Sequence, residues 1–452
     1  MPHSQIKVAI IGAGISGLTV ANGLLNDPAE RFDVQIYERD DVAFDSERGG
    51  YQLRIASNGL QGLRTASDAD LWSRLQDAWA GDTNAAPAVV DPKHFNIHLM
   101  LSNYKAYPTS RPVPRTSLRY ALLQKPMVQE RVHFGYNFER FEHVRDGEKS
   151  VMLYFDQGRS EKVDLLIAAD GSNSQINRQV GLQNKIKLNG WKLIQARDVI
   201  NAAQRERLPA SLKKCGSVMF LGGVPVSGFA SIYDSQSDND AASGKEKTWS
   251  LFWSCLVPES PADRMIKKAH GDSDMLIGLL VDYFRKELAF GESLPTIVTS
   301  TKNNLRTGLL TSSIKPEGEW RKSDADSRII LLGDAVHPMT PGRGQGANQA
   351  LTDAGKLIDL LRNSLLTDGD IHEQQLTRLI RAFDKEMYNR AFKMVKNSEQ
   401  VTNIDLTTIT GKIIAIAVAS GLTLAGWAMT ALETFGLKKV EATDFRILHP
   451  EV

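Results

Sequence analysis

The stretch ILLGDAVHPMTPGRGQGAN, residues 330–348, decides the fold of this chain. It begins with an apolar run typical of a buried strand, continues through Gly333-Asp334, and reaches a glycine-rich turn before a helical pattern. A carboxylate at the carboxyl end of a strand accepts hydrogen bonds from sugar-like hydroxyls. A glycine-rich turn at a helix N-terminus presents free N–H groups and a positive dipole end. These features suit the ribityl chain and ring of a flavin; an ordinary strand–turn–helix is the alternative.

A second strand–turn–helix lies at the N-terminus, where the apolar run 7–11 is followed by GAGISG, residues 12–17. In such a turn Gly12 permits the sharp bend, Gly14 lets the backbone approach a pyrophosphate, and Gly17 allows the helix to pack closely on the strand. The motif alone is weak, but a strand before it and a helix after it strengthen the prediction of a dinucleotide site.

The next predicted strand, residues 34–37, ends at Glu38, near the ~20-residue offset expected for a ribose-binding acid. Its carboxylate accepts a hydrogen bond from a ribose 2′-hydroxyl and repels a 2′-phosphate. This supports the dinucleotide interpretation.

Composition excludes several classes of protein. The 54 basic and 53 acidic residues nearly cancel, so no overall charge draws the chain to nucleic acid. Cys215 and Cys255 are the only cysteines, lie in apolar surroundings and form no metal-ligand cluster, which favours a reduced, cytoplasmic setting with no metal. The first five residues run directly into the first strand, and we expect no signal peptide.

Residues 413–432 carry no charge, and a helix of that length would span about 30 Å, roughly a bilayer core. Many of these residues are small, with Ala417, Gly421 and Ala425 at the four-residue spacing that lets helices approach closely. Packing on the protein, contact with a partner and membrane association remain alternatives for this segment.

The order of elements predicts an α/β fold with a Rossmann-like FAD-binding domain of the glutathione-reductase type, an inserted mainly-β substrate domain and C-terminal helices. The FAD-binding domain is expected over residues 1–80, 110–180 and 302–400. The substrate-binding domain is expected over 81–109 and 181–301, and a helical segment over 401–452. Aromatic strands between 186 and 301 are where an apolar substrate is expected.

Three motifs follow one another along the chain, and their order is characteristic: the glycine turn with Glu38-Arg39, then DGSNS at 170–174, then GDAVHP at 333–338. The chain resembles the single-component, FAD-dependent (class A) aromatic hydroxylases over about its first 400 residues. Arg115-x-x-Leu118-Arg119 and residues 194–196 are similar to the tetracycline-inactivating branch. Residues 50–54 look like monooxygenases of fungal natural-product pathways.

The resemblance implies FAD as cofactor, NADPH or NADH as transient reductant, and oxygen with a small molecule as substrates. It implies that Glu38 binds the adenosine ribose, that Asp334 binds the ribityl chain, and that Asp170 and Gly171 serve FAD and the nicotinamide. Residues expected to bind cofactor are Gly12, Gly14, Ser16, Gly17, Glu38, Arg39, Arg54, Arg115, Asp170, Gly171, Gly333, Asp334, Pro341, Gly344, Gln345, Gly346, Ala347 and Asn348. Residues expected to contact substrate are Gln195, Phe220 and Phe252.

The chain departs from the family at Asn177, which stands where an arginine is usual, with Arg178 next. This puts the nicotinamide contact in doubt. We expect His337 to be structural, bonded to the backbone around Pro338, and we assign no catalytic residue because the cofactor performs the difficult chemistry.

The expected activity is insertion of one oxygen atom into an apolar, aromatic or polycyclic molecule of secondary metabolism or xenobiotic modification, by hydroxylation, epoxidation or Baeyer–Villiger chemistry. A flavin-dependent halogenase or reductase, a nicotinamide-only dehydrogenase and a flavin-binding interaction protein are alternatives. The sequence does not fix the substrate, the choice between NADPH and NADH, or the oligomeric state.

Overall fold

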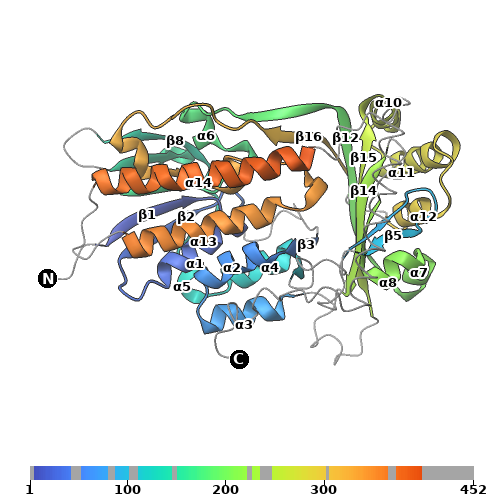
Figure 1. The fold of residues 1–452 in the computed structure, drawn as a ribbon, viewed down its shortest axis with the longest axis horizontal. Coiled ribbons are helices and arrows are strands. Elements are labelled where there is room, and N and C mark those ends of the chain that lie inside the picture. The colour runs from blue at the N-terminus through green and yellow to red at the C-terminus, as the bar shows by residue number, and fades with distance from the viewer. Residues whose placement is uncertain are drawn as a thin grey trace, which may run out of the picture. The chain divides into compact units, whose positions relative to one another are not determined.

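The structure is a computed structural model that describes residues 5–41, 52–79, 87–100, 110–144, 150–220, 226–234, 247–301, 305–364 and 373–399 (Figure 1). The chain is divided into two compact units, and the expected α/β fold is confirmed. Over the described residues, the first unit lies within Met1–Trp79, Val113–Ile186 and Thr311–Glu399, and the second within Ala80–Pro112 and Lys187–Leu310. The assignment of these units to FAD and to substrate stays a prediction.

A five-stranded parallel sheet forms the centre of the first unit, in the order β17-β11-β1-β2-β7. Its inner strands are rich in apolar residues because both faces of the sheet are buried; Val8, Ala9 and Ile10 are all at most 1% exposed. The strands are β1 (Ile6–Ile11), β2 (Phe32–Tyr37), β7 (Val132–His133), β11 (Leu165–Ala168) and β17 (Ile329–Leu331). Because they are parallel, their carboxyl ends share one edge.

The helices of the first unit include a glycine-lined contact between α2 and α13. A Cβ atom on Gly62 would lie 2.0 Å from the carbonyl oxygen of Leu351, and one on Gly355 would lie 2.7 Å from Cα of Gly62, so both sites require glycine. The helices are α1 (Ile15–Leu25), α2 (Ser57–Ala66), α3 (Ala69–Asp77), α4 (Arg115–Leu123), α5 (Pro126–Gln129), α6 (Gln175–Gln179), α13 (Gly346–Ser364) and α14 (Glu373–Glu399).

Two small sheets complete the first unit. Strands β8 (Phe138–His143), β9 (Val151–Phe155) and β10 (Ser160–Val163) form an antiparallel sheet in the order β10-β9-β8. Strands β3 (Gln52–Ile55) and β6 (Arg111–Pro114) form a two-stranded sheet.

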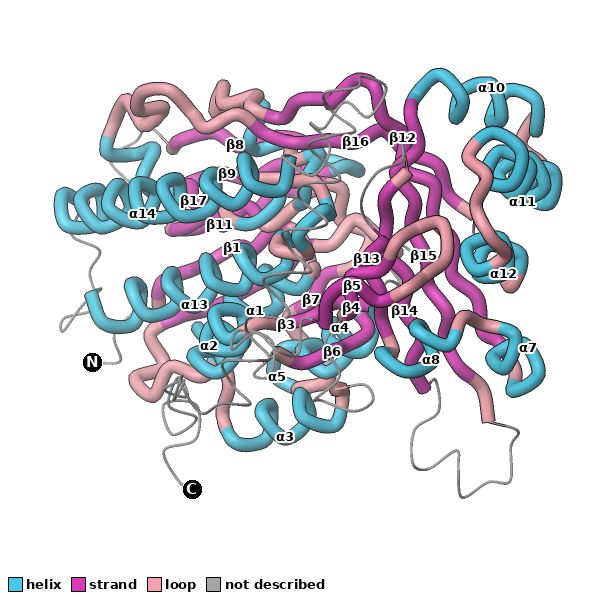
Figure 2. The backbone as a smooth tube through the Cα atoms, turned by 45° about the vertical axis from the view of Figure 1, so that its right-hand side comes forward, coloured by secondary structure: helices cyan, strands magenta, loops and turns pink. Residues whose placement is uncertain are grey.

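The second unit is a seven-stranded sheet with helices packed on one face, as Figure 2 shows. The strand order is β16-β12-β15-β14-β13-β4-β5. The strands are β4 (Ala88–Val90), β5 (Ile97–Met100), β12 (Lys185–Ile200), β13 (Ser217–Phe220), β14 (Ser227–Asp234), β15 (Trp249–Pro258) and β16 (Arg306–Ser313). The helices are α7 (Ala202–Arg207), α8 (Ala210–Cys215), α10 (Glu259–Ala269), α11 (Ser273–Asp282) and α12 (Ser293–Thr299).

Cys215 and Cys255 are buried and unpaired, and burial raises the pKa of both thiols. None of the helices within the described residues is long and apolar enough to cross a membrane. The apolar segment 413–432 lies outside the described residues.

Candidate functional site

The motif segments meet at the carboxyl edge of the parallel sheet. The glycine turn follows β1, Glu38 follows β2, Asp170 follows β11 after one residue, and Gly333 follows β17 after one residue. Neighbouring strands β17, β11, β1 and β2 therefore present these residues side by side, as expected for ligand sites in open parallel sheets. Two segments more than 300 residues apart also come close: a Cβ on Gly333 would lie 3.5 Å from Oγ of Ser16.

The three glycines of the N-terminal turn have different structural roles. Gly12 has φ +105°, and a Cβ there would lie 2.4 Å from the carbonyl oxygen of Ala169. A Cβ on Gly17 would lie 2.1 Å from the carbonyl oxygen of Gly12. Gly14 has extended backbone at the N-cap of α1, and a Cβ there would meet no heavy atom within 4 Å. Gly12 and Gly17 are therefore required by the fold, whereas Gly14 leaves space beside the turn.

Glu38 is tied to this turn by hydrogen bonds. Its Oε2 accepts from the backbone N–H of Ala13 at 2.9 Å, and its Oε1 accepts from that of Asp40 at 3.2 Å. Arg119 of α4 donates from Nε to the carbonyl oxygen of Ala13 at 2.8 Å, and its Nη2 lies 3.7 Å from Oε2 of Glu38. Sequence reasoning quoted Arg119 only as part of a motif, and the structure adds it to the site.

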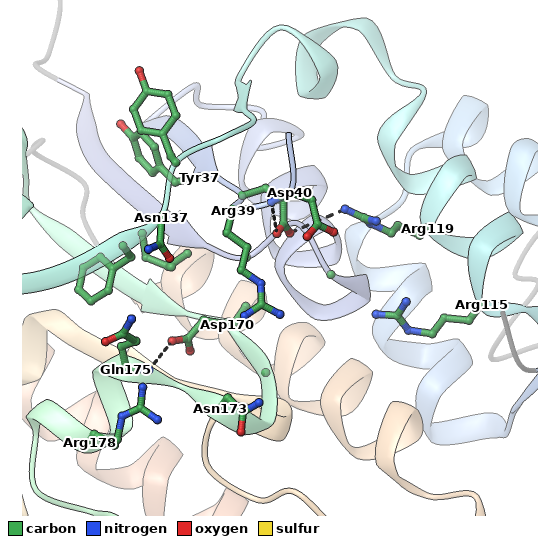
Figure 3. A pocket seen from close by; sticks show the side chains of 18 residues that line it. Tyr37, Arg39, Asp40, Arg115, Arg119, Asn137, Asp170, Asn173, Gln175 and Arg178 are labelled. Atoms are coloured by element: carbon green, nitrogen blue, oxygen red, sulfur yellow. Dashed lines mark hydrogen bonds and ion pairs between the residues drawn. The ribbon is translucent and has the colours of Figure 1, made fainter. Parts of the chain in front are cut away.

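A cavity of about 440 Å³ opens beside the turn and Glu38 (Figure 3). Figure 3 shows Arg39, Arg115, Arg119 and Arg178 arranged around it, so four cationic side chains line one recess. Such a set suits an anionic group of two phosphates. Further lining residues are Tyr136, Asn137, Phe138 and Gln175, which sequence reasoning had not singled out, and Asn173, which it quoted only within the DGSNS motif.

Asp170 and Gly171 line the same cavity. The Oδ2 atom of Asp170 accepts from the backbone N–H of Gln175 at 2.9 Å, whereas its Oδ1 atom is buried without a hydrogen-bond partner. Burial raises the pKa of this carboxyl, and hydrogen bonds from Ser174 and from the start of α6 oppose the shift. A buried acceptor at a cavity wall is costly unless a ligand donates to it, which fits a hydroxyl-bearing ligand.

Asp334 lies in a 3₁₀ helix of one turn, Gly333–Ala335, that follows β17, and Gly333 has φ +59°. The Asp334 side chain is exposed to solvent, although protein surrounds it on most sides. This limited hydration raises the pKa of the carboxyl, while the positive charges of His337 and Arg115 oppose the shift. The exposed surface leaves the carboxylate open to a ligand.

The predicted glycine-rich turn contains a further 3₁₀ turn, Pro341–Arg343, and α13 begins at Gly346. Asn348 is buried. Its Oδ1 accepts from the backbone N–H of Ala56 at 2.8 Å, and its Nδ2 donates to the carbonyl oxygens of Arg54 and Gly344 at 3.0 and 3.1 Å. The Asn348 side chain thus links α13 to the β3–α2 connection.

Asn177, at the position where the family usually has arginine, is buried beneath the turn after β17. Its Nδ2 donates to the carbonyl oxygen of Ala335 at 2.8 Å and to Oδ1 of Asn184 at 2.9 Å. Asn184 in turn donates to the carbonyl oxygen of Val336 at 2.8 Å. The departure therefore builds a structural amide pair, while Arg178 is exposed at the cavity.

In the second unit, strand alternation separates the predicted substrate residues. Gln195 and Phe252 lie on the face opposite the helices. Phe220 is fully buried in the helix-covered core against Phe95, with ring centroids 5.8 Å apart, so its prediction as a substrate contact is corrected to a packing role. Arg197, the cross-strand partner of Phe252, shares the face of Gln195 and donates from Nε to Oγ of Ser250 at 3.1 Å. Sequence reasoning missed Arg197.

Comparison with known proteins bears on this site. Residues 318–397, which contain the turn after β17 and most of α13 and α14, match the "FAD binding domain" family. Over 404 residues the chain is 27% identical to the FAD-dependent monooxygenase tazP of Aspergillus terreus, covering 82% of this chain and 92% of that protein. The chain is a relative of the FAD-dependent monooxygenases. The predicted family resemblance and the predicted FAD cofactor are confirmed at this level.

Other relatives extend the comparison. The chain is 26% identical over 369 residues to the chloroplastic zeaxanthin epoxidase of Solanum lycopersicum, which covers 79% of this chain. It spans about half the length of that relative, 48%. Among solved structures, Klebsiella pneumoniae HpxO complexed with FAD and uric acid has a TM-score of 0.68 at 19% identity, covering 94% and 95% of the two chains. The tetracycline destructase Tet(51) has a TM-score of 0.56 at 18% identity, covering 94% and 98%. These solved structures share the fold of this chain.

The residues present fit FAD. The open side of Gly14, the arginine-lined cavity, the unpartnered Oδ1 of Asp170 and the exposed Asp334 carboxylate are the donors, acceptors and space that a pyrophosphate flanked by two hydroxyl-bearing chains requires.

Proposed function

We propose that this protein is an FAD-dependent monooxygenase that uses NADPH or NADH and O2 to insert one oxygen atom into an apolar, aromatic or polycyclic small molecule. The observation that carries the proposal is the meeting of the glycine turn, Glu38, Asp170 and Asp334 at one edge of one parallel sheet. The similar proteins, which include a monooxygenase and an epoxidase, support oxygen insertion.

In this proposal the chain's own residues bind and orient the cofactor. Arg115 and Arg119 face the pyrophosphate with the N–H groups of the turn, Glu38 accepts from the adenosine ribose, and Asp334 accepts from the ribityl hydroxyls. The N-terminus of α13 directs its positive dipole end at the flavin ring and favours negative charge there. When bound, FAD supplies hydride acceptance from a nicotinamide and activation of oxygen.

Gln195, Phe252 and Arg197 are proposed substrate contacts on the sheet face opposite the helices. An aromatic surface excludes water, which protects reactive oxygen species from wasteful decay. The amide and guanidinium add hydrogen-bond donors that orient a polar substituent. The substrate is therefore proposed to be a mainly apolar molecule that carries at least one acceptor oxygen.

A direct experiment tests the function. Purified protein should be yellow or should take up added FAD, and should oxidise NADPH or NADH faster when a substrate is present. Metabolites from cells with and without the intact gene should differ by a compound heavier by one oxygen, and ¹⁸O2 should label it. A colourless protein that does not bind FAD but is saturated by NAD would instead support a nicotinamide-only dehydrogenase, and bromide-dependent product would support a halogenase.

The location of the protein and its contacts remain part of the proposal. We propose a cytoplasmic protein that contacts a membrane or a partner through residues 413–432, because that segment is uncharged and flanked by Lys412 and Lys438-Lys439. Native cell extract separated by sedimentation tests the membrane alternative: release from the membrane fraction by detergent alone supports it, and recovery in the supernatant argues against it.

A further inference from the structure

A cluster of buried charged groups lies beneath the turn that carries Asp334. Nε2 of His337 lies 2.6 Å from Oδ2 of Asp353 on α13, and both side chains are fully buried. Oδ1 of Asp353 accepts from Nη2 of Arg390 on α14 at 2.7 Å. The same Oδ2 accepts from the backbone N–H of Gly333 at 2.9 Å. One carboxylate therefore binds three partners, two from the turn after β17 and one from α14.

This arrangement differs from the expected role of His337. We expected a bond to the backbone around Pro338, but the ring pairs with Asp353 and packs edge-on against Phe392. Burial alone would lower the pKa of His337, but Asp353 outweighs burial and raises it. Burial alone would raise the pKa of Asp353, but His337 and Arg390 outweigh it and lower it. The three groups thus stabilise each other's charged forms.

The Asp353 carboxylate restrains the turn at two points. It accepts the N–H of Gly333, which immediately precedes Asp334, and it holds the ring of His337 three residues later. Inside the turn, the backbone N–H of His337 donates to the carbonyl oxygen of Gly333 at 2.9 Å. Asp353 therefore fixes the turn through Gly333 and His337, while the Asp334 side chain stays exposed to solvent.

We propose that Asp353 and Arg390 are positioning residues for the proposed FAD site: Arg390 orients Asp353, and Asp353 holds Gly333 and His337 so that the Asp334 carboxylate meets the ribityl hydroxyls. Neither residue lines the cavity beside the glycine turn. This inference rests on the proposed function, because the ligand that Asp334 meets is FAD. It assigns a role to a residue on α14, 56 positions after Asp334 in the sequence.

The first unit offers a matched control for this cluster. Arg321 and Asp384 form a second ion pair, with Nε and Oδ2 2.7 Å apart and the Arg321 side chain only 1% exposed. Arg321 also donates to the carbonyl oxygen of Ile329 at 2.6 Å, at the amino end of β17 and thus at the opposite end from Gly333. Asp384→Asn removes a comparable charge from the same unit without touching the turn.

The experiment compares full-length wild type, Asp353→Asn, Arg390→Lys and Asp384→Asn. The thermal midpoint of the apoprotein, the dissociation constant for FAD by fluorescence titration, and the visible absorption and circular dichroism of bound FAD are measured. We expect Asp353→Asn to weaken FAD binding about 10- to 100-fold, the range found for outer partners of metal ligands, and to alter the flavin spectrum. Arg390→Lys should retain most of the wild-type affinity for FAD because it keeps the positive charge. Asp384→Asn should lower the midpoint and leave FAD affinity within about twofold.

Each outcome is decisive. If wild type binds no FAD, the proposed function fails and the positioning role fails with it. If wild type binds FAD but Asp353→Asn binds it equally well with an unchanged spectrum, the positioning role alone is wrong. Equal losses of affinity in Asp353→Asn and Asp384→Asn would show a general effect of destabilisation and also overturn it. If Asp353→Asn does not fold, Arg390→Gln, altered at the partly exposed end of the cluster, replaces it under the same criteria.

Discussion

Alanine substitutions at Gly14 and Gly17 should separate cofactor binding from folding, although the two residues are three positions apart in one turn. At Gly17 the added Cβ would lie 2.1 Å from the carbonyl oxygen of Gly12 and 3.2 Å from Cγ2 of Ile10. A backbone oxygen cannot move aside alone, so the turn must shift. We expect Gly17→Ala to cost about 1–3 kcal/mol of unfolding free energy, the range for overpacked sites.

At Gly14 the backbone is extended, with φ −77°, and no heavy atom lies within 4 Å of the added Cβ. We therefore expect Gly14→Ala to change apoprotein stability by no more than about 0.5 kcal/mol. The methyl group would instead occupy space that the pyrophosphate needs. Loss of one hydrogen bond to a charged group costs about 1.5–3 kcal/mol, which corresponds to about a 10- to 150-fold higher dissociation constant for FAD.

Thermal unfolding of apoprotein and fluorescence titration with FAD measure the two effects separately. Gly14→Ala should unfold at the wild-type temperature and bind FAD weakly, whereas Gly17→Ala should unfold at a lower temperature. Wild-type FAD affinity in Gly14→Ala would refute the placement of the pyrophosphate. A Gly17→Ala apoprotein as stable as wild type would refute the packing argument.

Three further results are expected. Asp334→Ala should raise the dissociation constant for FAD about 10- to 100-fold by leaving ribityl hydroxyls unpaired, with Asp334→Asn intermediate; full occupancy and turnover in both would remove Asp334 from the site. Glu38→Ala should cost about 1 kcal/mol of apoprotein stability, measured by urea unfolding, because the N–H of Ala13 loses its partner, whereas Glu38→Gln should be closer to wild type. The stability advantage of wild type over His337→Asn should depend on pH. The His337 contribution is fully present below its ordinary pKa of 6.5 and is lost as pH rises through the raised folded value. The Asp353 contribution is present above 3.8 and is lost as pH falls through the lowered folded value. Denaturant unfolding from pH 4 to pH 9 tests this, and an advantage that grows toward pH 9 would contradict it.

The meeting of the motifs could be predicted from sequence because it depends only on strand direction. Apolar runs that end in Gly12, Asp170 and Gly333 each read as buried strands. Parallel strands bring their carboxyl ends to one edge whatever the order of the strands. The side chains that follow such strands therefore lie near one another without any knowledge of packing.

Residues whose role depends on side-chain direction were harder to predict. Phe220 and Phe252 both look like apolar residues in aromatic strands, but alternation along paired strands sends Phe220 into the helix-covered core. A strand's register relative to its neighbours decides this, and a one-residue shift reverses it. Without the pairing, the sequence does not tell one face of the sheet from the other.

The partner of His337 was also beyond sequence reasoning. Asp353 lies 16 residues later, and Arg390 belongs to the next helix. Their meeting depends on how α13 is rotated about its axis and on how α14 packs beside it.

The sheet of the first unit has a consequence for how the protein matures. Strand β17 is an edge strand of that sheet and pairs with β11. About 160 residues separate the two strands in the chain, and most of the second unit is synthesised between them. A nascent chain therefore carries the glycine turn and Glu38 long before Asp334 emerges. If these residues hold one cofactor, as proposed, its loading must await synthesis of β17 and the turn after it, so termination before residue 329 should leave a chain that cannot retain the cofactor.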